Sequence, residues 1–88
     1  MLFECDPEKE ALNLKKHGVD FSTVGAAFAD PRRVLAADRK HSANESRWFC
    51  IGKDGRGVLT ASFTLREGTV RIISAGYWRK GRKIYENQ

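Results

Sequence analysis

The chain of 88 residues lacks any long apolar segment. Its longest apolar run, residues 24–29, is far shorter than the roughly 20 residues that a membrane-spanning helix needs. The first residues, 1–6, lack both the basic and the apolar regions of a secretory signal. We therefore expect a single domain, residues 1–88, that stays in the cytoplasm and has no membrane partner.

Cysteine and the familiar catalytic motifs are also scarce. Only Cys5 and Cys50 occur, without CxxC spacing, so we expect two reduced, half-buried thiols and no zinc site or disulfide framework. The sequence has no HExxH motif, no GxSxG motif, no Gly-rich phosphate loop and no paired carboxylates at metal-ligand spacing. We therefore predict no metal ion and no cofactor.

Positive charge is plentiful and unevenly distributed. The chain has 16 Lys and Arg against 11 Asp and Glu, a net charge of +5. Six basic and two acidic residues lie in 66–88, so this end carries +4 of that charge. A basic end on a small domain favours a polyanionic partner, either nucleic acid or an acidic protein. A solvated, solubilising tail is the equally weighted alternative.

Two helices are predicted near the N-terminus, after a short strand at 2–5. Asp6 and Pro7 are typical of a helix start, and Gly18 follows a basic last turn in which His17 is explained electrostatically. A second helix is expected to begin with Asp20 as its N-cap and to end at Asp30, before a proline.

The rest of the chain predicts strands. Residues 34–37, 47–53, 58–65 and 69–75 have strand character, and Asp54-Gly55 is a strong hairpin signal. We predict an α+β fold with two N-terminal helices packed on one face of a three- to four-stranded antiparallel sheet. Arg71 would lie on the other, partly open face near the polar loop 38–46, and the chain would end in a tail or a short helix that is interrupted or capped at Gly81.

The remaining polar residues fit RNA cleavage without a metal. Such cleavage needs a base for the ribose 2′-OH, cations for the charge on the phosphoryl oxygens, and an acid for the leaving 5′-oxygen. Arginine suits the second task, and His41 is a natural proton carrier in a loop with Glu45 and Arg47. The alternative is a hydrated loop in which Glu45 and Arg47 pair with each other. Trp48 and Trp78 could stack on bases, but core positions are commoner for tryptophan.

The order of motifs from residue 3 to residue 85 closely resembles the BrnT toxin family. The resemblance is carried by Asp6-Pro7, Lys16-His17-Gly18-Val19-x-Phe21, Phe28-x-Asp30-Pro31, Asp38-x-x-His41-Ser42-x-x-Glu45-x-Arg47 and Arg71-Ile72-Ile73-Ser74-Ala75. It implies a RelE-like ribonuclease fold, RNA as substrate, and a BrnA-type antitoxin encoded beside the toxin. It also implies that operator DNA is bound only by the toxin–antitoxin complex.

The resemblance also implies site residues. It makes His41, Glu45, Arg47 and Arg71 the catalytic set. Family members often continue the last motif with Arg where this chain has Gly76, and we expect Arg79 to reach that place and to be a fifth catalytic residue. The predicted RNA-binding residues are Lys53, Lys80, Arg82, Lys83 and Tyr85, of which Tyr85 resembles the closing tyrosine of the family.

Two functions from different classes are therefore open. The first is an endoribonuclease toxin that inhibits translation and is neutralised by its antitoxin. The second is a catalytically weak or inactive basic module that binds nucleic acid or an antitoxin without cleavage. Only the first requires a proton carrier within hydrogen-bond reach of a phosphate that two arginines hold.

Overall fold

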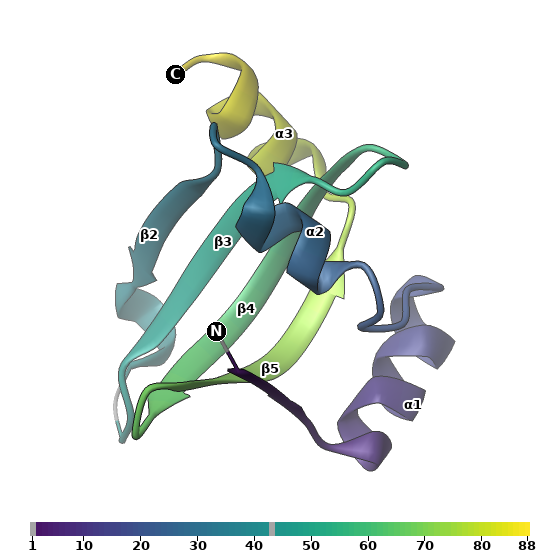
Figure 1. The fold of residues 1–88 in the computed structure, drawn as a ribbon, viewed down its shortest axis with the longest axis vertical. Helices are drawn as coiled ribbons and strands as arrows, with labels where there is room; N and C mark the ends of the chain where they lie inside the picture. Colours follow the sequence, from purple (N-terminus) through teal and green to yellow (C-terminus); the bar gives the residue numbers. More distant parts are fainter. Residues whose placement is uncertain (1, 43) are drawn as a thin grey trace.

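The computed structural model describes residues 2–42 and 44–88 as one mixed sheet with helices on both sides (Figure 1). Along the chain the elements are β1 (Leu2–Cys5), α1 (Pro7–His17), α2 (Val24–Ala29), β2 (Val34–Asp38), a 3₁₀ turn (Arg39–His41), β3 (Arg47–Lys53), β4 (Val58–Arg66), β5 (Thr69–Gly76) and α3 (Arg79–Glu86). The α+β class and the four later strands agree with the sequence prediction.

The sheet differs from the prediction in size and in direction. It has five strands in the order β1-β5-β4-β3-β2, and β1 runs parallel to β5 while every other pair is antiparallel. The prediction of three or four antiparallel strands was therefore wrong. Short hairpins impose antiparallel pairing from β3 to β5, whereas β1 and β5 are far apart in the sequence, so no short turn sets the direction of their pairing.

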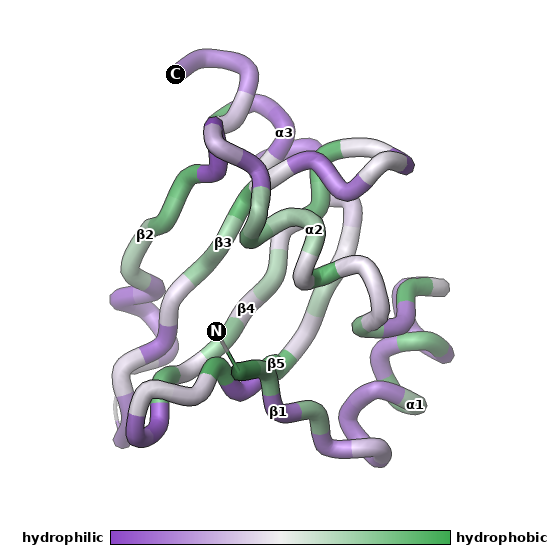
Figure 2. Tube along the Cα trace, viewed as in Figure 1, coloured by the Kyte–Doolittle hydropathy of each residue, from purple (hydrophilic) through white to green (hydrophobic). Residues whose placement is uncertain are grey.

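The helices do not all cover one face, which corrects a second prediction. Helix α2 packs Val24 and Ala27 on the face that carries Cys50, Leu59 and Ala61 (Figure 1). Helix α3 lies against the opposite face, because Ile51 and Thr60, which alternate with Cys50 and Leu59 along their strands, contact Gly81 and Tyr85. Hydrophobic residues accordingly follow α2 and the central strands, while α3 is mostly hydrophilic (Figure 2).

Helix α1 lies beyond β5, where the side chain of Asn13 makes hydrogen bonds to the β5 backbone. Asn13 is buried, and its amide donates to the carbonyls of Ala75 and Val19 at 2.8 Å each, while its Oδ1 accepts from the Ala75 N–H at 3.1 Å. Strand β1 pairs with β5 only as far as Ile72. Asn13 therefore satisfies backbone groups of β5 that β1 leaves unpaired, and it fixes α1 against the sheet.

Helix boundaries agree with the sequence at α1 and differ at α2 and α3. Asp6 caps α1, Gly18 ends it with a φ of 69°, and His17 lies in its last turn, all as predicted. Asp20 does not cap α2: its carboxylate accepts from Ser22 in a preceding turn, and the helix begins only at Val24. Helix α3 runs through Gly81 without interruption.

The reason that α3 tolerates Gly81 is its packing on the sheet. A Cβ at residue 81 would lie 2.0 Å from the Thr60 hydroxyl, so only glycine lets the helix approach β4 this closely.

Both cysteines are free thiols, but neither is half-buried: Cys5 is exposed on β1, and Cys50 is fully buried under α2.

Candidate active site

Two of the predicted catalytic arginines flank one residue of the central strand. Thr64 of β4 is the register partner of Arg47 on β3 and of Arg71 on β5. Because register partners point to the same face and adjacent strands lie about 4.8 Å apart, the two arginine Cα atoms are about 10 Å apart across Thr64. Both arginines therefore leave the sheet on the face opposite α2.

Glu45 joins these arginines around one hollow. The hollow has a volume of about 310 Å³, and Glu45, Arg47, Thr64 and Arg71 contribute to its wall together with the turn between β1 and α1. Both arginines are partly buried, whereas Glu45 is exposed. The structure thus brings together three of the predicted catalytic residues from two separate segments of the chain, residues 45–47 and strand β5.

His41 lines an adjoining hollow and is oriented by Asp38. This adjoining hollow, of about 390 Å³, shares Glu45 and Arg47 with the hollow between the arginines. The His41 Nδ1 lies 3.0 Å from the Asp38 Oδ2, and Asp38 also accepts from the His41 backbone N–H at 3.3 Å. Asp38 is buried, while the His41 side chain is 57% exposed. A carboxylate that holds Nδ1–H leaves Nε2 as the nitrogen available for proton transfer.

Hydrogen bonds close the segment between β2 and β3 beneath His41. The Ser42 hydroxyl donates to the Asp38 carbonyl at 2.5 Å and accepts from the Arg47 N–H at 3.0 Å. The side chain of one serine therefore connects the residue that ends β2 with the residue that begins β3. This connection holds His41 and Arg47 at fixed positions relative to the sheet.

Each arginine of the hollow has a different ionic environment. Arg71 Nε lies 3.3 Å from Glu4 Oε1, and Glu4 is its register partner on β1. Glu45 pairs with Arg66 at 3.3 Å, and not with Arg47 as in the alternative drawn from the sequence. In 2–42 and 44–88, Arg47 has no carboxylate within 4.0 Å. The site therefore offers one unpaired guanidinium and one that is shared with an exposed carboxylate.

A comparison with family models places the chain in a known group. The model for the ribonuclease toxin BrnT of type II toxin–antitoxin systems matches residues 5–81. The chain belongs to the BrnT ribonuclease toxin family. A search among curated proteins found no match.

The BrnT match spans every residue of the predicted catalytic set, because it extends from Cys5 to Gly81. It leaves out Arg82, Lys83 and Tyr85, three of the predicted RNA-binding residues. Membership of a type II toxin–antitoxin family implies a protein antitoxin as partner. No helix within the described part of the chain is long and apolar enough to cross a membrane.

Two predictions about the C-terminal residues change once the structure is considered. Arg79, expected near Arg71, lies in a different hollow at the other end of the sheet. Tyr85, expected to bind RNA, is 4% exposed, packs with Ile51 and Val58, and donates from its hydroxyl to Asp30 Oδ2 at 2.6 Å. Its ring is therefore part of the core.

The hydrogen bond from Tyr85 also changes the acidity of its acceptor. Together with the backbone N–H groups of Lys53 and Arg32, it lowers the pKa of Asp30 to about 2. The same bond raises the pKa of Tyr85. Lys53 lies beside this pair, with its ammonium 5.9 Å from the centre of the Tyr85 ring. Of the predicted RNA-binding residues, Lys53 and the α3 residues Lys80, Arg82 and Lys83 are exposed.

Trp78 explains why residue 76 has no side chain here. A Cβ at Gly76 would lie 2.6–2.9 Å from three atoms of the Trp78 indole, so the ring occupies the space where a longer residue would start. The same ring meets His17 edge-on, with centroids 5.1 Å apart. Trp78 and Trp48 are each 37% exposed, so the expectation of core positions was wrong for both.

Sequence reasoning missed two residues that shape the site. Asp38 belongs to one of the family motifs but was assigned no role, although an acid three residues before a histidine is a usable signal for an orienting carboxylate. Thr64 has no such signal, because only the register of three strands places it between the two arginines. Among the described residues, no cluster of three or more His, Cys, Asp and Glu could hold a metal ion.

Proposed function

We propose that this BrnT toxin is a metal-independent endoribonuclease whose active centre is the hollow between Arg47 and Arg71. The observation that carries the proposal is the placement of two guanidinium groups and Glu45 around one hollow of about 310 Å³, with His41 in the adjoining one. Guanidinium forks match phosphoryl oxygens and keep their charge at any working pH.

The chemistry follows from these positions. One proton carrier removes the proton of a ribose 2′-OH, and the 2′-oxygen then attacks the adjacent phosphorus. Arg47 and Arg71 stabilise the negative charge that develops on the phosphoryl oxygens. The bond to the 5′-oxygen breaks, and a second carrier protonates this leaving group. The products are a 2′,3′-cyclic phosphate and a free 5′-hydroxyl, and no metal or cofactor enters the balance.

His41 and Glu45 are the proposed pair of proton carriers. Glu45 is held near the hollow by Arg66, 3.3 Å away. The contact with Asp38 fixes the His41 ring, so that Nε2 is free to give a proton to the leaving oxygen or to take one. Both side chains are exposed enough to meet a phosphodiester from solvent.

The test compares Arg71→Lys with Glu4→Gln. If Arg71 binds phosphate, the lysine variant keeps the charge but loses the two parallel donors, and kcat should fall roughly 10²–10³-fold. Glu4→Gln leaves the guanidinium in place, so its kcat should stay within a few-fold of the wild type.

The measurement is cleavage of a fixed RNA in EDTA, with folding checked by circular dichroism. Full activity of Arg71→Lys would mean that Arg71 only pairs with Glu4 across the strands. An inactive wild-type protein that still binds RNA would favour the alternative of a binding module without cleavage.

The partners of the BrnT family extend the proposal. We propose that the chain has the RelE-like fold, acts in the cytoplasm, and is neutralised by a BrnA-type antitoxin. We further propose that it contacts operator DNA only within that complex. Co-expression with the antitoxin encoded by the neighbouring reading frame should restore growth, and the two proteins should co-purify as a complex. Elution of the two proteins as separate species in size-exclusion chromatography would refute the pairing.

A further inference from the structure

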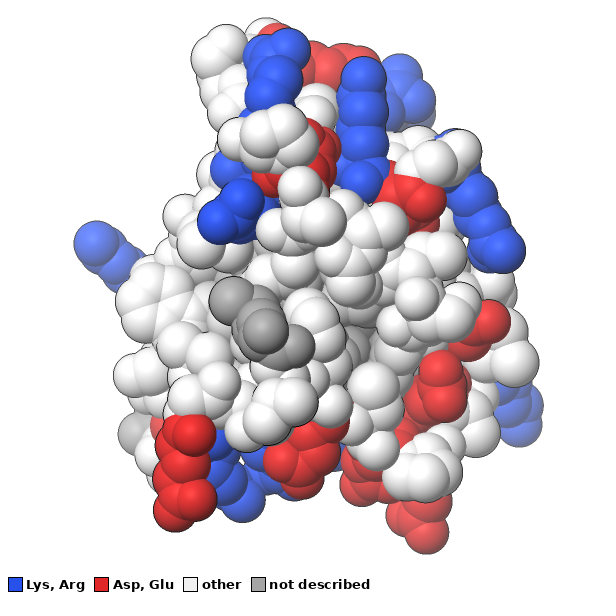
Figure 3. Space-filling view, viewed as in Figure 1, with Lys and Arg blue, Asp and Glu red and all other residues white. Residues whose placement is uncertain are grey.

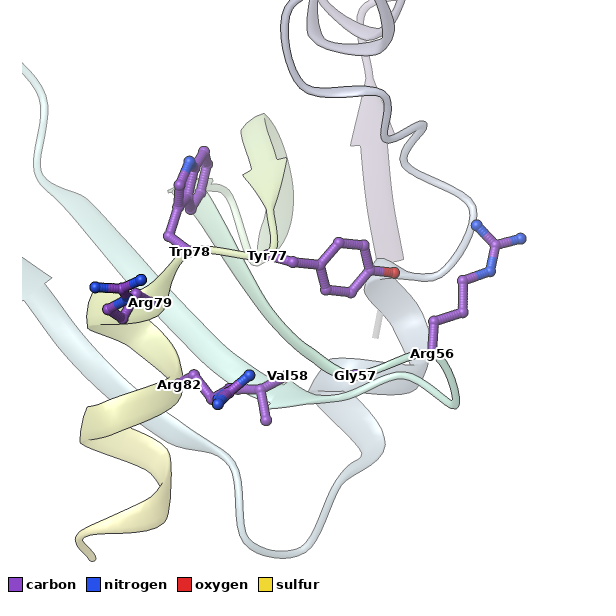
Figure 4. A pocket seen from close by; sticks show the side chains of 7 residues that line it. All are labelled: Arg56, Gly57, Val58, Tyr77, Trp78, Arg79 and Arg82. Carbon is purple, nitrogen blue, oxygen red and sulfur yellow. The ribbon is translucent and has the colours of Figure 1, made fainter.

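A second basic hollow lies between the β3–β4 hairpin and the start of α3 (Figure 4). Its volume is about 390 Å³, and its wall includes Arg56 from the hairpin, Tyr77 from the β5–α3 connection, and Arg79 and Arg82 from successive turns of α3. None of these residues lines the hollow that holds Arg47 and Arg71. The two hollows are therefore separate places on the molecule.

The three arginines of this second hollow form few ion pairs, although Asp54 lies beside Arg56 and Tyr77. Within 2–42 and 44–88, Arg56 and Arg79 have no carboxylate within 4.0 Å, and Arg82 meets only Glu86, at 3.6 Å. All three side chains belong to exposed residues. Basic side chains outnumber the acidic ones among them at this end of the molecule, whereas acidic side chains predominate along the opposite edge (Figure 3). Several unpaired cations around one hollow attract a polyanion.

Tyr77 supplies a fixed aromatic surface between these cations. It points toward the hairpin that carries Arg56, while Trp78 points away from it (Figure 4). The Tyr77 hydroxyl donates to Asp54 Oδ2, and burial together with this bond raises the pKa of Tyr77. Tyr77 is 41% exposed, and the neighbouring Gly57 places no side chain over its ring, where a Cβ would lie 3.6 Å from the nearest ring carbon. A restrained, uncovered ring is the surface on which a base stacks with little loss of entropy.

We propose that this hollow binds one nucleotide of the RNA substrate outside the cleavage site, with the base on Tyr77 and the phosphate held by Arg79 and Arg82. Arg56, which lies beyond the Tyr77 hydroxyl on the hairpin, adds positive charge to the rim of the hollow (Figure 4). The inference rests on the proposed ribonuclease function, since it takes RNA as the ligand. An acidic peptide segment of a partner protein would use the cations, but it would leave the exposed ring of Tyr77 without a role.

The separation of the two hollows defines how much RNA the protein contacts. Val58 of β4 lines the second hollow and Thr64 of the same strand lines the first. Six residues of strand correspond to about 20 Å. A single-stranded RNA of several nucleotides spans this distance. The second hollow should therefore contribute to the binding of long substrates and not to the binding of the shortest ones.

The binding test uses a fluorescein-labelled, single-stranded RNA of roughly ten nucleotides with 2′-O-methyl riboses, near the site size of single-strand binders. This probe lacks the attacking hydroxyl, so binding is measured without cleavage. Tyr77→Leu should weaken binding roughly 5- to 100-fold, the range for loss of one base stack. Tyr77→Phe keeps the ring without the bond to Asp54 and should bind within a few-fold of the wild type.

The two arginines of α3 give an independent arm on an exposed helix. Arg79→Gln with Arg82→Gln should lower the log–log salt slope by about 1.4, since each phosphate contact contributes roughly 0.7 for a single strand. Lys15→Gln, an exposed cation on α1, is the matched control and should change the slope little. Unchanged affinity in Tyr77→Leu together with an unchanged slope in the arginine variant would overturn the proposal.

Cleavage kinetics separate this inference from the proposed function. The double arginine variant should raise KM for a long RNA with kcat unchanged, and it should cleave a dinucleotide as the wild type does. If the wild type cleaves neither substrate, the ribonuclease function fails, while the uncleavable probe still decides whether the hollow binds RNA. Variants that bind the probe normally but lose the antitoxin would assign the hollow to the protein partner and refute the inference.

Discussion

The contact between α2 and β3 depends on one glycine, and its replacement should destabilise the protein measurably. A Cβ at Gly52 would lie 2.4 Å from the carbonyl oxygen of Ala27 and 3.1 Å from its carbonyl carbon. The obstacle is helix backbone, which cannot rotate away as the end of a side chain can. In Gly52→Ala, helix α2 must therefore move outward by about 1 Å to restore ordinary contact.

The expected magnitude follows from two opposing terms. Overpacking of a well-filled interface typically costs about 1–3 kcal/mol, and a backbone obstacle favours the upper part of that range. Replacing glycine also reduces the entropy of the unfolded chain, which offsets about 0.4–1 kcal/mol. The free energy of unfolding should therefore fall by about 2 kcal/mol. For a domain of this size that corresponds to a decrease in Tm of about 8–16 °C.

Gly25, near the start of α2, provides the matched control. It is exposed and lies inside the helix, and a Cβ added there would have nothing within 4 Å. Gly25→Ala should raise the free energy of unfolding by about 0.5–1 kcal/mol, because alanine is the better helix former. Urea melts of both variants measure the two effects, and equal stability of Gly52→Ala and the wild type would refute the packing of α2 on β3. RNA cleavage per folded molecule should be unchanged in both, since the proposed site lies on the other face.

Three further outcomes are expected. Asp38→Asn should lower kcat by roughly 10²-fold or more with a smaller effect on KM, because the amide no longer selects the tautomer and orientation of His41. A kcat equal to that of the wild type at all pH values would argue that Asp38 only closes the loop. The free energy of unfolding should decline as the pH falls from about 4 toward 2, because the pKa of Asp30 is lowered to about 2 in the folded state and protonation removes the charged form that Tyr85 stabilises. In urea melts at each pH, Tyr85→Phe should make this acid-induced decline smaller. A thiol reagent should modify the exposed Cys5 in the native protein and reach Cys50 only on unfolding, because burial raises the pKa of Cys50 to about 11; two thiols titrated at the same rate would contradict its buried position.

Much of the local structure could be predicted because it depends on neighbouring residues. Asp6, Pro7 and Gly18 define the ends of α1 through hydrogen bonds and backbone angles within a few residues. The alternation of side chains in β4 and the Asp54-Gly55 turn specify the hairpin in the same way. The start of α2 was misplaced because Asp20 caps a turn that the sequence does not distinguish from a helix.

The candidate site was partly predictable. Glu45, Arg47 and His41 are close in sequence, so their proximity follows from one short segment. Arg71 could be placed on the same face by strand alternation, but its distance from Arg47 depends on the register of three strands across Thr64. Asp38 was within reach of the sequence, since it precedes His41 by three residues.

The sequence by itself determined the α+β class, the run of strands after residue 34, the basic C-terminal end and the BrnT motifs. Only the tertiary structure decided that β1 pairs with β5, that α3 covers the second face, that Tyr85 is buried, and that Arg79 lies about 20 Å along the sheet from the Arg71 hollow. The physical reason is one of range. Caps, turns and alternation act over a few residues, whereas strand order and the burial of a helix face depend on how the whole chain removes apolar surface from water.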